Sequence, residues 1–411
     1  MKLSEGVLDT GVVRSRAVLP GPPDYWSYSS LKEIGECPRR YALERAGYPD
    51  LWGGRGYPSL ATAPALFGNV VHGALEVVVK ALTEAGIDSP LTLAATEVLR
   101  GLGGLTTVLE DVASEQLASL DDNPRLDPDR RRRIARELRA QVPEARVQVQ
   151  TYLSRTAFVP GTPASTTSVR VVMGGGFRRR ALGEGSRAEV ALIADDLRLL
   201  GWIDLLTIVA RAVSIVDYKT GAESQGHQDQ LRLYALLWDR DRVANPERLP
   251  TASLTLAYRE RDVSVEVPSV GELQALGDAL VSEVEQADVE LRSGAPRPIP
   301  SKSNCARCEV RHLCESYWKE VAPNVSDIGE EAWFDYEGTI GEQNGPRSWW
   351  VIDPQTDRPE LLLRTSTTTP PFTEGDRVRL LGLRRDIDPG VSSPLATLTA
   401  TSEVFRVEVV S

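Results

Sequence analysis

Ser214-Ile215-Val216-Asp217-Tyr218-Lys219-Thr220-Gly221, together with Gly201-Trp202-Ile203-Asp204 shortly before it, decides the fold class of this chain. Both stretches are apolar with β-branched residues, which predicts two adjacent β-strands. An acid interrupts or ends the first strand, and an acid and a lysine two residues apart end the second. Side chains alternate between the faces of a strand, so Asp217 and Lys219 share one face and lie beside Asp204 if the strands pair.

The segments around these stretches predict a mixed α/β domain over residues 25–324. Strands are expected at 187–194, 197–209, 212–218, 252–258 and 262–267, and helices at about 67–85, 228–239 and 271–292. Residues 86–158, rich in Ala, Leu, Arg and Glu, are expected to form a helical insert. We therefore predict a mixed central sheet flanked by helices, after an irregular lead over residues 1–24.

The character of the sequence changes at about residue 325. Short alternating strands are expected there, at 333–340, 348–353, 360–364, 376–383 and 396–409. Five such strands predict a small β-barrel, and an oligonucleotide-binding (OB) barrel is one candidate. Trp349, Trp350, Arg377 and Arg379 could form a nucleic-acid-binding face of stacking rings and cations. Alternatively, the tryptophans are core residues or pack against the α/β domain, or the barrel docks a protein.

Charge and hydropathy limit the function classes. The 411-residue chain has a net charge of −11, which by itself does not favour a nucleic-acid binder. Two arginine runs, at 130–139 and 177–180, are candidate basic patches or else solvated surface. No apolar run approaches the ~20 residues that span a bilayer, and the N-terminus lacks the apolar stretch of a secretory signal. We expect a cytoplasmic protein without membrane contact.

The acids of the paired stretches predict a site for a hard divalent cation. Asp204 and Asp217 offer carboxylate oxygens, which suit Mg²⁺ and Mn²⁺. A cation held there would polarise a phosphate and lower the pKa of a bound water. Lys219 could orient or deprotonate that water and offset charge on the phosphate. The pattern indicates phosphodiester hydrolysis.

The chain has four cysteines, and three of them form a Cys-x2-Cys-x5-Cys cluster at Cys305, Cys308 and Cys314. The fourth, Cys37, precedes Pro38 at or near the end of an expected helix. Disulfides are disfavoured in the cytosol, so this close spacing indicates a metal site. Four thiolates can hold a [4Fe–4S] cluster or a zinc ion, and the spacing alone leaves both open.

At these residues the chain resembles the PD-(D/E)xK nuclease superfamily, in its RecB-like branch with AddB-type and CRISPR-associated exonucleases. Four motifs carry the resemblance: Gly68-x-x-x-His72, Gly201-x-x-Asp204, Asp217-Tyr-Lys-Thr-Gly221 and Gln230-x-x-x-Tyr234. The resemblance covers about residues 25–320 and implies a restriction-endonuclease-like core. It leaves the C-terminal barrel unexplained.

The resemblance implies a role for each motif residue. The metal ligands would be His72, Asp204, Asp217 and the backbone carbonyl of Tyr218. Lys219 would serve the attacking water, while Gln230 and Tyr234 would position the substrate or Lys219. Glu189, on the preceding strand, is a candidate auxiliary acid whose place nothing in the sequence fixes.

The resemblance also favours the iron–sulfur cluster, because iron–sulfur members place one cysteine before the helical histidine and three after the core. It implies a Mg²⁺- or Mn²⁺-dependent deoxyribonuclease, most simply an exonuclease on single-stranded DNA ends in repair, recombination or defence. The sequence contains no Gly-x4-Gly-Lys-Ser/Thr phosphate loop, so unwinding would need a helicase or defence-complex partner. The alternative is a non-catalytic DNA-binding or assembly subunit that kept the fold.

Overall fold

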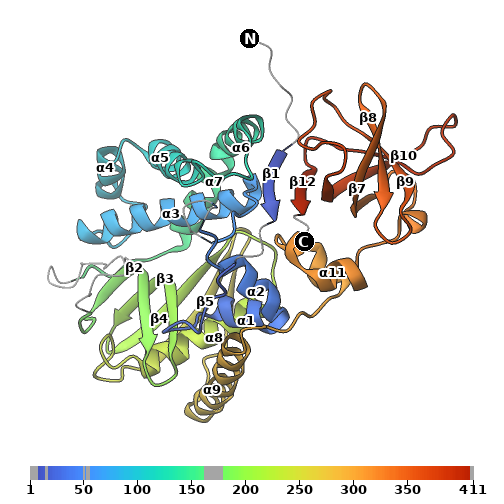
Figure 1. Cartoon of the computed structure of the whole chain (residues 1–411). Helices are drawn as coiled ribbons and strands as arrows, with labels where there is room; N and C mark the ends of the chain where they lie inside the picture. Colours follow the sequence, from blue (N-terminus) through green and yellow to red (C-terminus); the bar gives the residue numbers. More distant parts are fainter. Residues whose placement is uncertain (1–7, 14–16, 50, 52–55, 162–178, 408–411) are drawn as a thin grey trace.

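The computed structural model describes residues 8–13, 17–49, 51, 56–161 and 179–407. Its strands form two sheets, of five strands in the α/β domain and of seven strands at the C-terminal end (Figure 1). The first sheet is flanked by helices, and the second closes into a barrel.

The sheet of the α/β domain has the order β2-β3-β4-β5-β6. Its strands are β2 (Gly185–Ala194), β3 (Leu199–Val209), β4 (Ala212–Lys219), β5 (Thr251–Tyr258) and β6 (Asp262–Val265). Neighbouring strands are antiparallel except β4 and β5, which are parallel and connected through a helix. The sheet is therefore mixed, as the sequence predicts, and its strands coincide closely with the apolar stretches.

Helices pack on both faces of this sheet (Figure 1). On one face lie α1 (Tyr28–Glu36), α2 (Pro38–Arg45), α8 (Gln225–Arg240) and α9 (Val270–Arg292). Their core with the sheet includes Trp26, Ile203 and Trp238, each no more than 1% exposed. On the other face lies α3 (Ala63–Glu84), followed by the helical insert. The result is a three-layer α/β domain.

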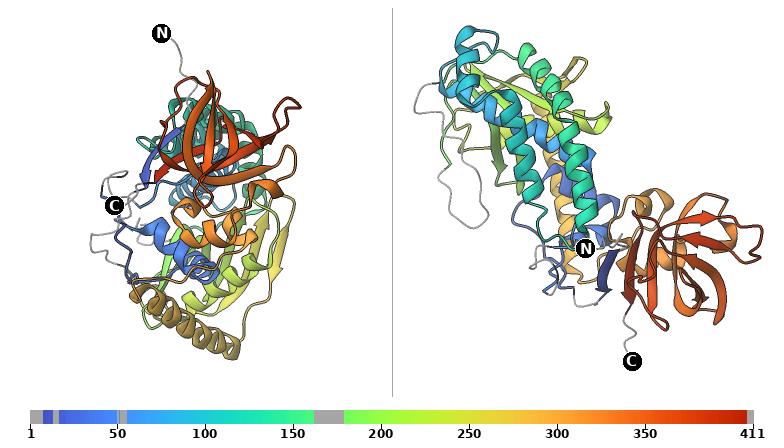
Figure 2. Two further views of the ribbon diagram at one scale, coloured as in Figure 1. Left: turned by 45° about the vertical axis from the view of Figure 1, so that its right-hand side comes forward. Right: turned by 90° about the horizontal axis from the view of Figure 1, so that it is seen from above.

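The helical insert consists of four helices that pack around α3 (Figure 2, right). They are α4 (Leu93–Gly101), α5 (Leu105–Ala118), α6 (Pro128–Ala140) and α7 (Val142–Arg155). α3 is the one described helix long and apolar enough to cross a membrane, but it packs against α5, α6, α7 and β2. Val71, Ala74 and Val78 are fully buried in this packing, so α3 is the core helix of the insert layer.

The C-terminal sheet contains a closed five-stranded barrel. Its strands are β7 (Trp333–Gly345), β8 (Ser348–Asp353), β9 (Arg358–Arg364), β10 (Arg377–Asp386) and β11 (Leu395–Thr397). They follow the order β7-β8-β9-β11-β10, and β10 pairs back with β7. Val351, Leu361 and Leu380 lie in the barrel interior and are inaccessible to solvent. The small barrel predicted from the alternating strands is confirmed, and its five strands fit an OB-like fold.

Two expectations about this sheet are wrong. Within the lead that was expected to be irregular, Leu8–Val13 form β1, which pairs in parallel with β12 (Glu403–Val407). The single strand expected at 396–409 is instead β11 and β12, separated by a turn in which Ser402 N donates to Thr399 O. Pairing between strands almost 400 residues apart leaves no local sequence signal.

The nucleic-acid-binding face predicted on the barrel is not formed as expected. Trp349 is 7% exposed and packs edge-on against Phe372 in the barrel core. Arg379 is 3% exposed and forms ion pairs with Glu337 and Glu315. Burial removes both side chains from contact with a nucleic acid. In addition, Arg377 is paired with Glu337, and Trp350 is half-buried.

Buried polar contacts fix the barrel to the α/β domain. Arg125, before α6, forms a two-pronged ion pair with Glu403 of β12, at 2.9 and 2.8 Å. Asp335 of β7 accepts hydrogen bonds from Arg311 and from the hydroxyl of Tyr317. The ring of His312 stacks on Phe405 with centroids 3.7 Å apart. Three of these seven residues, Arg311, His312 and Tyr317, lie beside the cysteine cluster in the sequence.

Candidate active site

Two motif glycines allow helices to approach the sheet closely. A Cβ on Gly68 of α3 would lie 3.1 Å from Thr220 Oγ1, just after the end of β4. A Cβ on Gly201 of β3 would lie 2.5 Å from Leu237 Cδ1 and 2.9 Å from Tyr234 Cε1. The contact at Gly68 is at the limit of ordinary packing, and the contacts at Gly201 are closer than that limit. A larger residue would therefore push α3 away at position 68 and α8 away at position 201. These glycines bring the histidine and tyrosine motifs to the strands.

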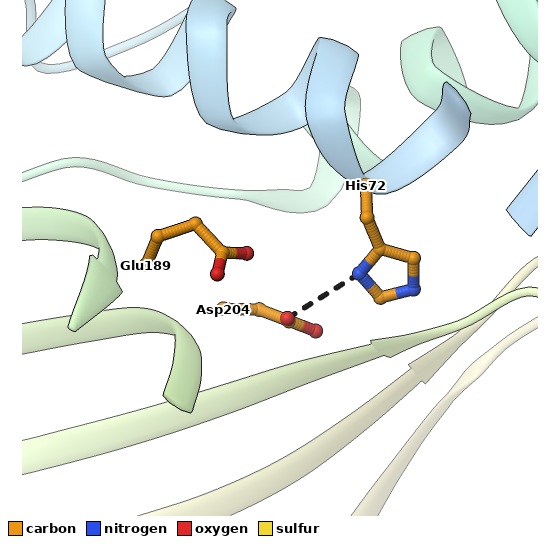
Figure 3. Close-up of side chains that lie close together, drawn as sticks. All are labelled: His72, Glu189 and Asp204. Atoms are coloured by element: carbon orange, nitrogen blue, oxygen red, sulfur yellow. Dashed lines mark ion pairs between the residues drawn. The ribbon is translucent and has the colours of Figure 1, made fainter. Parts of the chain in front are cut away.

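His72, Glu189 and Asp204 converge between α3 and the sheet (Figure 3). Each residue offers a ligand atom, and these atoms lie within 4.8 Å of one another. His72 reaches toward the sheet from α3, and its Nδ1 lies 3.3 Å from Asp204 Oδ1. One imidazole and two carboxylates form a donor set that binds divalent metal ions.

Glu189 joins this cluster because β2 is distorted at that residue. Its φ is +47°, in the left-handed region that non-glycine residues adopt at a cost of about 1–2 kcal/mol. Flanking residues keep regular pairs, Ala188 with Leu205 and Val190 with Ile203, so Glu189 lies opposite Asp204. Nothing in the sequence fixes the place of Glu189, although an acid between apolar residues on a strand adjacent to Asp204 is a usable signal.

Asp204 lies where β3 and β4 separate. Regular pairing between the strands ends at Leu205 and Val216. Beyond that point, Asp204 Oδ2 accepts a hydrogen bond of 2.6 Å from the backbone N–H of Tyr218. The separation opens a gap in the sheet, and the carboxylate satisfies the backbone donor that pairing leaves free.

Lys219 is held by a chain of polar contacts. Its Nζ lies 2.6 Å from Asp217 Oδ2, which confirms that the two side chains share one strand face. The same Nζ donates to Gln230 Oε1 at 2.8 Å, and Gln230 Nε2 donates to the hydroxyl of Tyr234 at 2.7 Å. The Gln-x-x-x-Tyr motif on α8 thus contacts Lys219 directly. Asp217 Oδ2 is buried and, apart from the ion pair, has no well-oriented hydrogen bond.

The site carries more negative charge than its cations balance. Burial, and then the charge of Asp204, raises the pKa of Glu189 to about 8. Burial and Asp204 also raise the pKa of Asp217 to about 7, although Lys219 opposes this shift. For Asp204 itself, burial acts upward, but His72 and the Tyr218 N–H outweigh it and lower the pKa. For His72, burial acts downward, and Asp204 outweighs it and raises the pKa.

A divalent cation would relieve this imbalance, since it would stabilise the ionised forms of Glu189 and Asp217. The buried carboxylate of Asp217 and the converging donors of the cluster fit such an ion. Of the predicted metal ligands, His72 and Asp204 lie in one tight group. Asp217 pairs with Lys219 and lies close enough to Asp204 for that charge to raise its pKa. The backbone N–H of Tyr218 donates to Asp204.

The four cysteines come together at a second location. Cys37 is the residue between α1 and α2, and all four thiols line one small cavity with Pro298 and Ile299. The cysteines form no disulfide. Burial raises the pKa of Cys305 and raises that of Cys308 to about 12. A cationic metal centre would lower these pKa values, because it stabilises the thiolate form of its ligands.

Several arginines of the two runs are paired with acids. In the first run, Arg131 pairs with Asp121 and Arg132 with Asp129. In the second, Arg179 pairs with the buried Asp241. Residues 177–178 lie outside the part of the chain that the structure describes.

Comparison with protein families agrees with this geometry. A family model described as the PD-(D/E)XK nuclease superfamily matches residues 25–315, a range that contains the acidic cluster, Lys219 and all four cysteines. A comparison with curated proteins finds no match. By the extent of the family match, this chain belongs to the PD-(D/E)XK nuclease superfamily.

Proposed function

We propose that this protein is a Mg²⁺- or Mn²⁺-dependent deoxyribonuclease that acts as an exonuclease on single-stranded DNA ends. The observation that carries the proposal is the convergence of Glu189, Asp204, Asp217, His72 and Lys219 from four elements of the fold. Buried carboxylates with raised pKa values cost folding free energy. Such a cost is typical of sites that are built for chemistry rather than for stability.

In phosphodiester hydrolysis, the residues of the site would have different roles. His72, Glu189 and Asp204 would hold the metal ion, with Asp217 and the Tyr218 carbonyl as further ligands that the family resemblance implies. When bound, the ion supplies Lewis acidity toward the phosphate and makes a coordinated water more acidic. This assignment adds Glu189 to the ligands expected from the motifs.

Lys219 would orient the attacking water and neutralise charge that develops on the phosphate. Its ammonium group is restrained by Asp217 on one side and by Gln230 on the other. Tyr234 restrains Gln230 in turn, so Gln230 and Tyr234 act as positioning residues for Lys219. Pre-set geometry of this kind lowers the barrier because no reorganisation is needed during the reaction.

Digestion of end-labelled DNA tests the proposed activity. Wild type is expected to cleave single-stranded DNA with Mn²⁺ and not with EDTA. Lys219→Ala should lose about 100-fold or more in rate, as when one charge-stabilising donor is removed from an active site. Lys80→Ala, which removes an exposed lysine from α3, is the matched control and should keep the wild-type rate.

The product ladder of that digestion also separates exonuclease from endonuclease action. Equal cleavage by wild type and Lys219→Ala would contradict the assigned site. DNA binding without cleavage by folded wild type would favour the alternative, a DNA-binding or assembly subunit. Single-stranded specificity would fit a helicase or defence-complex partner that supplies unwound ends.

The four cysteines support a [4Fe–4S] cluster. Among the described residues, the only three ligating side chains within 4.8 Å of one another are His72, Glu189 and Asp204. No three of the thiols therefore lie within 4.8 Å of one another, whereas four Zn–S bonds of ~2.3 Å impose about 4 Å between every pair of sulfur atoms. A cubane cluster has larger separations because each thiolate binds a different iron atom. We infer a structural cluster, with zinc as the alternative.

A further inference from the structure

His227 lies in the first turn of α8, on the same side of the helix as Gln230 and Tyr234. Gln230, three residues further along α8, binds Lys219. On the other side, His227 Nδ1 lies 2.8 Å from the hydroxyl of Tyr258, and Tyr258 is the cross-strand partner of Lys219 on β5. Two independent connections therefore place this imidazole next to Lys219.

Tyr258 is the hydrogen-bond partner of His227 Nδ1. When the Tyr258 hydroxyl donates to Nδ1, the proton of the neutral imidazole is on Nε2, and Nε2–H is a donor. Burial, followed by the charges of Lys219 and Lys32, lowers the pKa of His227 and so favours this neutral form.

His227 Nε2–H has no hydrogen-bond partner in the described part of the chain. His227 is only partly buried and its Nε2 is accessible, so solvent or a ligand can reach this atom. The cations within electrostatic range are Lys219 and Lys32, and Lys32 Nζ lies 3.5 Å from where a Cβ on Gly226 would be. An oriented N–H donor beside two ammonium groups suits an anionic oxygen.

We propose that His227 is a substrate-contacting residue whose Nε2–H donates to a phosphate oxygen of the bound strand, on the Lys219 side of the site. This inference rests on the proposed nuclease function. The contact is made by a neutral donor and is available before and during the reaction. It should therefore contribute to substrate binding rather than to the chemical step.

Steady-state cleavage kinetics of His227→Ala, His227→Gln and Gln228→Ala test this assignment. His227→Ala should raise KM about tenfold, the effect of losing one hydrogen bond to a charged oxygen, with kcat within about twofold of wild type. His227→Gln places an amide N–H near the position of Nε2 and should recover most of the affinity. Gln228→Ala, on the next residue of the same turn, should behave as wild type.

A purely structural role for His227 would give a different result. If His227 only pins the start of α8, its loss would disturb Gln230 and Lys219, and kcat would fall while KM stayed constant. That outcome, or an unchanged KM, would overturn the proposal. If His227→Ala does not fold, Tyr258→Phe provides the second variant. It keeps the imidazole but removes the hydroxyl that contacts Nδ1, and it should also raise KM.

The same experiment distinguishes this inference from the proposed function. Cleavage by wild type that is lost in Lys219→Ala but unchanged in His227→Ala would refute only the role of His227. Absence of metal-dependent cleavage in folded wild type would refute both.

Discussion

At the residue scale, Glu189 and Asp217 differ most from the exposed acids of the chain. Burial places their pKa values at about 8 and about 7, against 4.5 and 3.8 for ordinary Glu and Asp. Both groups bind protons more tightly in the folded protein than in the unfolded chain. Proton binding and metal binding at this site should therefore compete.

The stability of the metal-free protein should fall as pH rises. A raised folded-state pKa contributes stability that is present below the unfolded pKa, about 4, and is lost as pH rises to about 8. In EDTA, the Tm is expected to decrease over this range. Added Mn²⁺ should raise the Tm most at about pH 8, where both acids ionise readily. Differential scanning calorimetry across this range measures both effects.

Glu189→Gln is the control for this pH dependence. It removes one titrating group from the cluster and should flatten the decrease in Tm while weakening the Mn²⁺ effect. A Mn²⁺-induced rise in Tm that does not depend on pH would contradict the assignment of these acids as ligands.

At the scale of elements, the site depends on how closely α8 packs against β3. Gly201 makes this contact possible, because Tyr234 and Leu237 occupy the space that a Cβ would need. Tyr234 is also the last member of the hydrogen-bond chain that restrains Lys219. The packing of one helix on one strand thus sets the position of the Lys219 side chain.

Gly201→Ala should reduce both stability and activity. The added methyl group overpacks the interface, which costs about 1–3 kcal/mol of unfolding free energy. Displacement of Tyr234 should also lower the cleavage rate by more than the loss of folded protein explains. Urea unfolding and kinetics on the same samples would measure the two effects. Gly271→Ala on α9, where a Cβ would meet nothing within 4 Å, should leave both unchanged.

At the scale of the whole molecule, the segment that carries the cysteine cluster also contacts the barrel. The segment between Cys308 and the end of α11 (Glu315–Glu320) holds Arg311, His312 and Tyr317. These residues contact Asp335 of the barrel and Phe405 of β12, the strand that pairs with β10. Arg379 of the barrel donates to the carbonyl of His312, two residues before Cys314. A metal centre that orders these cysteines would therefore also order the segment that contacts the barrel.

Cys308→Ser should abolish the centre and loosen the barrel. Anaerobically purified wild type is expected to be brown, with a broad absorbance band near ~400 nm, and the variant colourless. Limited proteolysis should then cut the variant between the two domains, because the segment that carries the barrel loses its restraint. Ser303→Ala, an exposed neighbour, is the control and should keep colour and resistance. Colourless wild type with stoichiometric zinc would contradict the iron assignment.

Local patterns in the sequence were sufficient for the elements and for grouping Asp204, Asp217 and Lys219, while the family resemblance supplied His72, Gln230 and Tyr234. Strands β3 and β4 and helix α8 follow from hydrophobic periodicity, which acts over a few residues. The shared face of Asp217 and Lys219 follows from strand alternation alone. Gln230 and Tyr234 lie four residues apart, as neighbours on a helix must. Each of these predictions depends on backbone geometry that the nearby residues determine.

Tertiary structure decided the features that depend on distant segments. Glu189 joins His72 and Asp204 because β2 is distorted opposite Asp204, and His227 finds its hydrogen-bond partner, Tyr258, on another strand. Trp349 and Arg379, which composition alone could place on a binding face, are buried by the closure and docking of the barrel. Burial and pairing depend on which surfaces meet in space, whereas periodicity reports only which face of an element is apolar.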